Sequence, residues 1–156
     1  MQFEQTLVQV QAKDGSTETA KIEWGSGPQN LADSRAFVRI TLDGRSEEES
    51  AFDFYSAFQR ARRSFETEGF RFLCYGASLN VWPSGMVRDM GMGRKGYKLH
   101  KGRDTTFDDL VPIFESGNDV IPSTVEEQCA YANAWYEDAP RRGRARSDRS
   151  WWQFWR

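Results

Sequence analysis

The sequence has few of the residues that cross-link small proteins or hold metal ions. Among 156 residues there are two cysteines, Cys74 and Cys129, and one histidine, His100. Two cysteines exclude a framework of several disulfides and a four-cysteine zinc site. A single histidine excludes a HExxH centre and any cage built from several histidines. We therefore expect no metal ion and no cofactor.

Long apolar runs are also absent. No stretch of about 18 apolar residues occurs, so the sequence predicts no membrane-spanning helix. The first residues, 1–6, have neither a basic n-region nor an apolar h-region, and no signal peptide is predicted. Two cysteines and no targeting signal favour a cytoplasmic location with reduced thiols.

Charge is divided unevenly along the chain. Residues 1–139 carry 15 basic and 22 acidic side chains, a net −7, whereas residues 140–156 carry six arginines and one aspartate, a net +5. This shift predicts a single domain over 1–139, of ordinary domain length, followed by a basic Trp/Arg-rich tail over 140–156.

Alternating apolar residues and turn signals predict most of the secondary structure. The predicted strands cover 3–12, 17–24, 36–42, 70–75, 79–82 and 97–100. A first helix is expected to open at Ser46–Glu49, which matches a capping box, and to end before Gly69. Its apolar spacing is Phe54, Phe58, Ala61 and Phe65, while Arg60, Arg62 and Arg63 suit a solvated helix end.

A second capping box, Ser123 with Glu126, predicts a helix ended by Pro140. Its expected buried stripe is Val125, Cys129, Ala132 and Tyr136. The fold class is therefore α+β, with a mainly antiparallel sheet of about five strands and two amphipathic helices.

Residues 83–96 read as a long glycine-rich loop. Gly91, Gly93 and Gly96 match G-x-G-x-x-G, but a strand-like segment follows them, whereas the dinucleotide fingerprint needs a helix there. Long loops are often functional, and Met, Trp and Arg are common at protein interfaces. The predicted partner-binding residues are Trp82, Met86, Arg88, Asp89, Met90, Arg94 and Lys95, with acidic support from Glu47, Glu48 and Asp53.

No enzyme signature appears in the sequence. His100 stands between lysines, and both cysteines lie on apolar faces, where thiols are usually inert. A dyad of His100 with Cys74 or Cys129 stays open as an alternative. The prediction is that the chain is not an enzyme and has no catalytic residue.

Residues 75–99, YGASLNVWPSGMVRDMGMGRKGYKL, and 119–128, DVIPSTVEEQ, resemble small bacterial proteins of unassigned activity, some of which are similar to immunity partners of secreted toxins. The resemblance implies a non-enzymatic cytoplasmic protein that binds a cognate toxin and occludes its active site. An acidic body suits this role, because toxins that act on nucleic acid often present a basic cleft.

Two alternative functions remain. One is a small-molecule or nucleotide-binding enzyme that closes the loop 83–96 over an anion held by Arg88, Arg94 and Lys95. The other is an adaptor that binds nucleic acid or a membrane surface through the tail alone. The tail residues predicted to bind are Arg141, Arg142, Arg144, Trp151, Trp152 and Trp155. The tail also fits two further interpretations: docking into an apolar groove, or no function.

Overall fold

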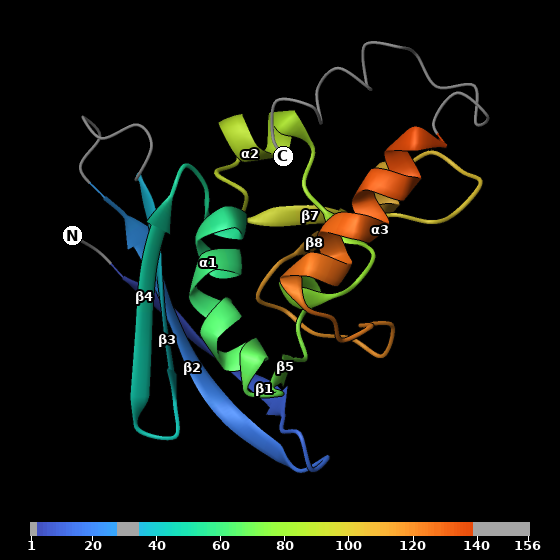
Figure 1. The fold of residues 1–156 in the computed structure, drawn as a ribbon. Coiled ribbons are helices and arrows are strands. Elements are labelled where there is room, and N and C mark those ends of the chain that lie inside the picture. The colour runs from blue at the N-terminus through green and yellow to red at the C-terminus, as the bar shows by residue number, and fades with distance from the viewer. Residues whose placement is uncertain (1–2, 28–34, 139–156) are drawn as a thin grey trace.

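The structure, a computed structural model, describes residues 3–27 and 35–138 (Figure 1). Within these residues it has the expected α+β fold, with an antiparallel five-stranded sheet, a second small sheet and three helices. The tail predicted over 140–156 lies outside the described residues. None of the helices in the described part of the chain combines the length and apolar character that crossing a bilayer requires.

The larger sheet is formed almost entirely by the N-terminal third of the chain. Its strands are β1 (Glu4–Gln11), β2 (Thr17–Ser26), β3 (Ala36–Leu42), β4 (Arg45–Ala51) and β5 (Arg71–Phe72). They run in the order β4-β3-β2-β1-β5 with every neighbouring pair antiparallel. Alternate residues such as Val10, Ile22 and Ile40 are fully buried on one face, which is the period-2 pattern that the sequence shows.

The segment Ser46–Glu49 is strand, so the predicted capping box is wrong. Asp43 and Gly44 have φ angles of 53° and 78°, and this pair makes a two-residue hairpin turn from β3 into β4. The turn sets the register that places Ser46 opposite Thr41 and Glu48 opposite Arg39. The local helix-start pattern is thus overridden by pairing with β3.

Helix α1 (Phe54–Thr67) begins after this strand and packs across the sheet, as Figure 1 shows. Its N-cap is Asp53, whose Oδ1 accepts a hydrogen bond of 2.8 Å from the Ser56 N–H. Phe58 and Phe65 reach the core and each contacts Phe72 of β5 edge-to-face, at ring-centroid distances of 5.7 and 6.0 Å.

The second half of the chain builds a smaller layer beside α1 (Figure 1). Strands β6 (Val81–Trp82), β7 (Lys95–Lys98) and β8 (Leu110–Pro112) form an antiparallel sheet in that order. A short helix, α2 (Gly85–Met90), lies between β6 and β7, and α3 (Val125–Glu137) follows β8. Single 3₁₀ turns cover Tyr75–Ala77 and Phe107–Asp109.

Helix α3 starts one residue later than predicted. Thr124 is the N-cap and forms a capping box with Glu127, whereas Ser123 is buried and donates to the Ala77 carbonyl. The buried face is also shifted: Val125 and Ala132 are in it, but Cys129 and Tyr136 are only half-buried. Gln128 and Trp135 take the remaining buried positions.

Arg62 explains why Gln128, a polar residue, lies on the buried face of α3. It is fully buried instead of lying at a solvated helix end, and it forms a buried ion pair with Glu66. Its Nη2 donates to Gln128 Oε1 at 2.6 Å, and Gln128 Nε2 donates to the Ser78 carbonyl at 2.8 Å. This network joins α1 to α3, since buried polar groups need partners.

Candidate partner-binding surface

The segment predicted to be a structureless loop, 83–96, contains α2 and the start of β7. Ser84 caps the helix by accepting a hydrogen bond of 3.1 Å from the Val87 N–H, and the Gly91 N–H closes the last turn on the Val87 carbonyl. The expectation of a long loop was wrong because six residues are too few to show a helical apolar period.

The glycines of this segment serve local packing. Gly93 has a φ of 67°, and a Cβ at this position would lie 2.7 Å from Asp53 Oδ1. A Cβ on Gly96 would lie 2.7 Å from a methyl group of Val81 in the neighbouring strand. The G-x-G-x-x-G spacing therefore reflects close approach to α1 and β6.

Two of the predicted partner-binding residues, Asp53 and Arg88, hold α2 in place from inside. Their side chains are 1% and 3% exposed, and Asp53 Oδ2 lies 3.3 Å from Arg88 Nη1. The same Nη1 donates to Ser56 Oγ at 2.7 Å, and the guanidinium lies 5.3 Å from the ring centroids of Tyr55 and Trp82. Asp53 and Arg88 thus position the helix and have almost no surface of their own.

Arg35 adds a second attachment that the sequence did not indicate. Its Nη2 donates to the carbonyls of Arg88 and Asp89 at 2.9 and 3.0 Å, and its Nε donates to the Phe52 carbonyl at 2.6 Å. One guanidinium therefore joins the C-terminal end of α2 to the connection between β4 and α1. An arginine at a helix C-terminus also suits the helix dipole.

The outer face of α2 presents three side chains at helical spacing. Met86, Asp89 and Met90 are all exposed, and the methionines are 60% and 80% accessible. Positions three and four apart share one side of a helix, so the three form a single surface, which we call the α2 face. The structure brings these predicted residues together.

Trp82 is the last residue of β6, shortly before α2 in the chain, and is 8% exposed. It lines a recess of about 480 Å³ between α1 and α3, together with Arg60, Arg63 and Cys129. Its ring contacts Tyr55 edge-to-face at 5.6 Å. Trp82 therefore supports the core and leaves only a small edge accessible.

Arg94 and Lys95 lie in a different environment from Arg88. Arg94 Nη1 is 2.7 Å from Glu4 Oε2 of β1, and this contact holds the pKa of the Glu4 carboxyl below its usual value. Both Arg94 and Lys95 line a groove between β1 and the small sheet. Because Arg88 is paired with Asp53 in the interior, Arg88, Arg94 and Lys95 do not surround a common anion-binding site.

The predicted acidic residues of β4 point to opposite faces of an edge strand. Glu48 pairs with Arg39 on the outer face, with 3.0 Å between Oε1 and Nη2. Glu47 lies on the α1 side, 3.6 Å from Nε of Arg45. Both carboxylates are partly exposed, so the open edge of the sheet is acidic.

Cys74, Cys129 and His100 are the groups with reactive potential that the sequence offers. Burial raises the pKa of the Cys74 thiol to about 12, and burial also raises the pKa of Cys129. His100 Nε2 lies 3.6 Å from Asp109 Oδ1, and no hydrogen bond among the described residues joins it to a cysteine. Within the described part of the chain, no group of three or more His, Cys, Asp or Glu residues could hold a metal ion.

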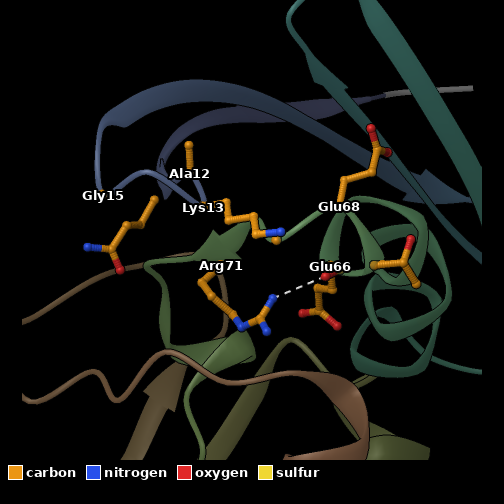
Figure 2. A pocket seen from close by; sticks show the side chains of 9 residues that line it. Ala12, Lys13, Gly15, Glu66, Glu68 and Arg71 are labelled. Atoms are coloured by element: carbon orange, nitrogen blue, oxygen red, sulfur yellow. Dashed lines mark hydrogen bonds between the residues drawn. The ribbon is translucent and has the colours of Figure 1, made fainter.

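Another recess lies where the β1–β2 hairpin meets the C-terminal end of α1 (Figure 2). Lys13 and Arg71 enter it from opposite sides, and Arg71 Nη1 donates to the Glu66 carbonyl at 3.2 Å. The Glu68 carboxylate pairs with Arg45 on its other side. The Arg71 contact satisfies one backbone carbonyl at the end of α1, and the Glu68–Arg45 ion pair ties the same helix end to β4.

One exposed aromatic residue, Phe107, lies outside the segments that the sequence indicated as binding surfaces. Phe107 is 87% exposed on the 3₁₀ turn that follows β7, and Asp108 is exposed beside it. No periodic pattern marks a single apolar residue on such a turn, so only the structure shows it.

No known family model matches this chain, and no curated protein matches it in sequence. The predicted tail residues, including Arg141 and Trp151, lie outside the described residues.

Proposed function

We propose that this protein is a non-enzymatic binding protein, an immunity protein that occludes the active site of a bacterial toxin with its α2 face. The observation that carries the proposal is the exposure of Met86 and Met90 on α2. The buried ion pair between Asp53 and Arg88, together with Arg35, fixes this helix to the rest of the protein. Single exposed apolar residues are common, but two of them on one rigidly held helical face form a surface.

Rigid presentation favours binding. Association loses free energy when loops must become ordered, and a surface that is already fixed avoids this cost. Methionine side chains remain adaptable within such a surface, because the unbranched thioether fits irregular pockets. The α2 face thus combines a fixed backbone with side chains that can adjust to a partner.

Charge supports a basic partner. Residues 1–139 carry a net −7, and Asp89 places one of these charges within the α2 face. Strand β4, which carries the acidic edge, leads directly into α1. Arg35, which also binds the end of α2, donates to the Phe52 carbonyl in this connection. Opposite potentials accelerate association and disfavour wrong partners, and an active site that acts on nucleic acid is commonly basic.

The test uses the full chain and the purified toxin domain encoded by the adjacent gene. Calorimetry should show a complex at micromolar concentration or tighter, and the toxin's activity should fall in proportion to complex formed. The double variant Met86→Lys/Met90→Lys should weaken the complex by at least about thirty-fold, because it removes two central apolar contacts and adds charges that a basic site repels.

Phe107→Lys is the control for position, since it places one lysine at another highly exposed apolar position outside the α2 face. We expect it to leave affinity and inhibition unchanged. The absence of a complex with the unaltered chain would overturn the proposal. Weakening by Phe107→Lys alone would move the contact to the 107–109 turn and contradict the role of the α2 face.

A further inference from the structure

One edge of β1 is only half covered. β1 pairs with β2 along Glu4–Gln11, but on its other side it pairs with β5 only at Val10 and Gln11, with one further hydrogen bond from the Leu73 N–H to the Gln9 carbonyl. Within the described residues no strand covers this edge over residues 4–8. That is a stretch of five residues, about 17 Å at strand spacing.

The direction of the open backbone groups follows from the pairing. In an antiparallel strand, successive residues direct their N–H and C=O groups to opposite sides. Because the Gln9 carbonyl points toward β5, the N–H and C=O groups of Gln5 and Leu7 point to the same, uncovered side. Those of Thr6 and Val8 serve the ladder with β2.

A groove runs beside this open edge. It holds about 590 Å³, within the range of ligand-binding pockets. Its polar lining residues are Glu4, Gln5, Thr6, Arg94, Lys95 and Glu115, with Pro112 beside them. Trp24 and Phe114 contribute its aromatic surface, with ring centroids 4.5 Å apart. None of the residues of the α2 face lines it.

From this juxtaposition we propose that the groove binds an extended peptide segment of a partner protein, which pairs with β1 at Gln5 and Leu7 as an added strand. Main-chain hydrogen bonds would provide affinity, as in other cases of strand addition, and alternate side chains would provide specificity. The residues of the peptide that face Trp24 and Phe114 are apolar. The intervening residues face the outer, solvated side, where the Leu7 side chain is 67% exposed.

This interaction is independent of the toxin complex, because it uses backbone groups of β1. The peptide is defined by its extended backbone and by apolar residues at every second position. A second copy of this chain pairing edge to edge is the competing occupant, and the experiment separates the two.

The probe is a random heptapeptide library displayed on phage and selected on the full chain. Recovered sequences are synthesised with blocked ends, and their affinities are measured by calorimetry. We expect apolar residues at alternate positions. N-methylation of the amides in one alternate register should abolish binding, whereas N-methylation in the other register should leave it intact, because only one set of amides faces β1.

The matched variants change the edge of the protein itself. Leu7→Pro removes an N–H on the open side without removing a ladder hydrogen bond to β2, and it should weaken peptide binding by about ten-fold or more. Leu7→Ala removes the side chain but keeps the N–H, and it should bind as the unaltered chain does. Gln5→Pro against Gln5→Ala repeats the comparison nearer the start of the strand, where a loss of folding is less severe.

Three results would overturn the proposal. The first is that phage selection on the unaltered chain enriches no peptide sequence more than selection on Leu7→Pro does. The second is that the peptides bind Leu7→Pro and Gln5→Pro as tightly as they bind the alanine variants, and the third is that N-methylation leaves the affinity unchanged in both registers. Sedimentation of the unaltered chain tests the competing occupant. A concentration-dependent dimer that is lost in Leu7→Pro would assign the edge to a second copy and would also overturn it.

Discussion

Asp53 and Arg88 form an ion pair inside the protein, with 3.3 Å between Oδ2 and Nη1, and this pair joins the N-cap of α1 to the middle of α2. The carboxylate has two roles, since its other oxygen caps α1 through the Ser56 N–H. The surface proposed to meet a partner is therefore held by charges that the partner does not reach.

Replacing Asp53 by asparagine separates these roles. Asparagine can still cap the helix, but it removes the buried charge partner of Arg88. We expect Asp53→Asn to lower the free energy of unfolding by about 3–5 kcal/mol, the usual cost of breaking a buried pair. Urea denaturation measures the change. Asp89→Asn, on the exposed face of α2, should stay within about 0.5 kcal/mol of the unaltered protein. Equal costs for the two variants would contradict the structural role of the pair.

Gly93 offers a test of how closely the segment after α2 approaches the N-cap of α1. Gly93 and Gly102 both have positive φ angles, of 67° and 82°, but a Cβ on Gly102 meets no atom within 4 Å, whereas one on Gly93 meets Asp53. Gly102→Ala should cost about 1–2 kcal/mol from backbone strain alone. Gly93→Ala should cost clearly more and should also speed hydrogen exchange at the Gly91 amide, which closes the last turn of α2. Equal losses of unfolding free energy in Gly93→Ala and Gly102→Ala would show that Asp53 moves away from the added methyl group at little cost.

The sequence predicts the long, strongly patterned elements well. Strands 17–24 and 36–42 and the helix containing Phe58 and Phe65 are confirmed, because their apolar residues repeat over enough positions to define a period. Ser46–Glu49 was misassigned because a helix-start pattern and a strand can share the same polar letters. The turn at Asp43–Gly44 decides between them, because it sets the register in which this segment pairs with β3.

Shorter elements and the site lie beyond such patterns. β6 has two residues and α2 has six, too few for a period to appear, so the small sheet depends on contacts across the fold. The burial of Arg62 with Gln128 follows from a network that hydrophobic patterning does not record. For the same reason the sequence could place Arg88 and Met90 in one segment, but not assign one to the interior and the other to solvent.

The two thiols should differ in reactivity. Burial raises the pKa of Cys74 to about 12 and removes it from solvent, while Cys129 is half-buried with a pKa raised by its surroundings. Because the thiolate is the reacting form, a thiol reagent at about pH 8 should modify Cys129 slowly and Cys74 only after unfolding. Mass spectrometry of the labelled, digested protein distinguishes the two sites. Cys129→Ser should leave no reactive thiol in the folded protein. Rapid labelling of Cys74 in the folded state would contradict its placement.

The last prediction concerns acid stability and depends on Asp109. Hydrogen bonds from Arg103 and from the Thr106 N–H hold the pKa of the Asp109 carboxyl below its ordinary value of 3.8. Folding therefore favours the ionised form. The resulting stabilisation is present above about pH 3.8 and is lost as the pH falls through the lower folded-state pKa. Asp109→Asn should be less stable than the unaltered protein at neutral pH, and the difference should shrink as the pH falls below 3.8. Urea denaturation at a series of pH values measures this.

Asp108→Asn, at the exposed neighbouring position, is the control and should keep the full loss of stability in acid. An unchanged pH dependence in Asp109→Asn would show that the Arg103 contact does not stabilise the fold.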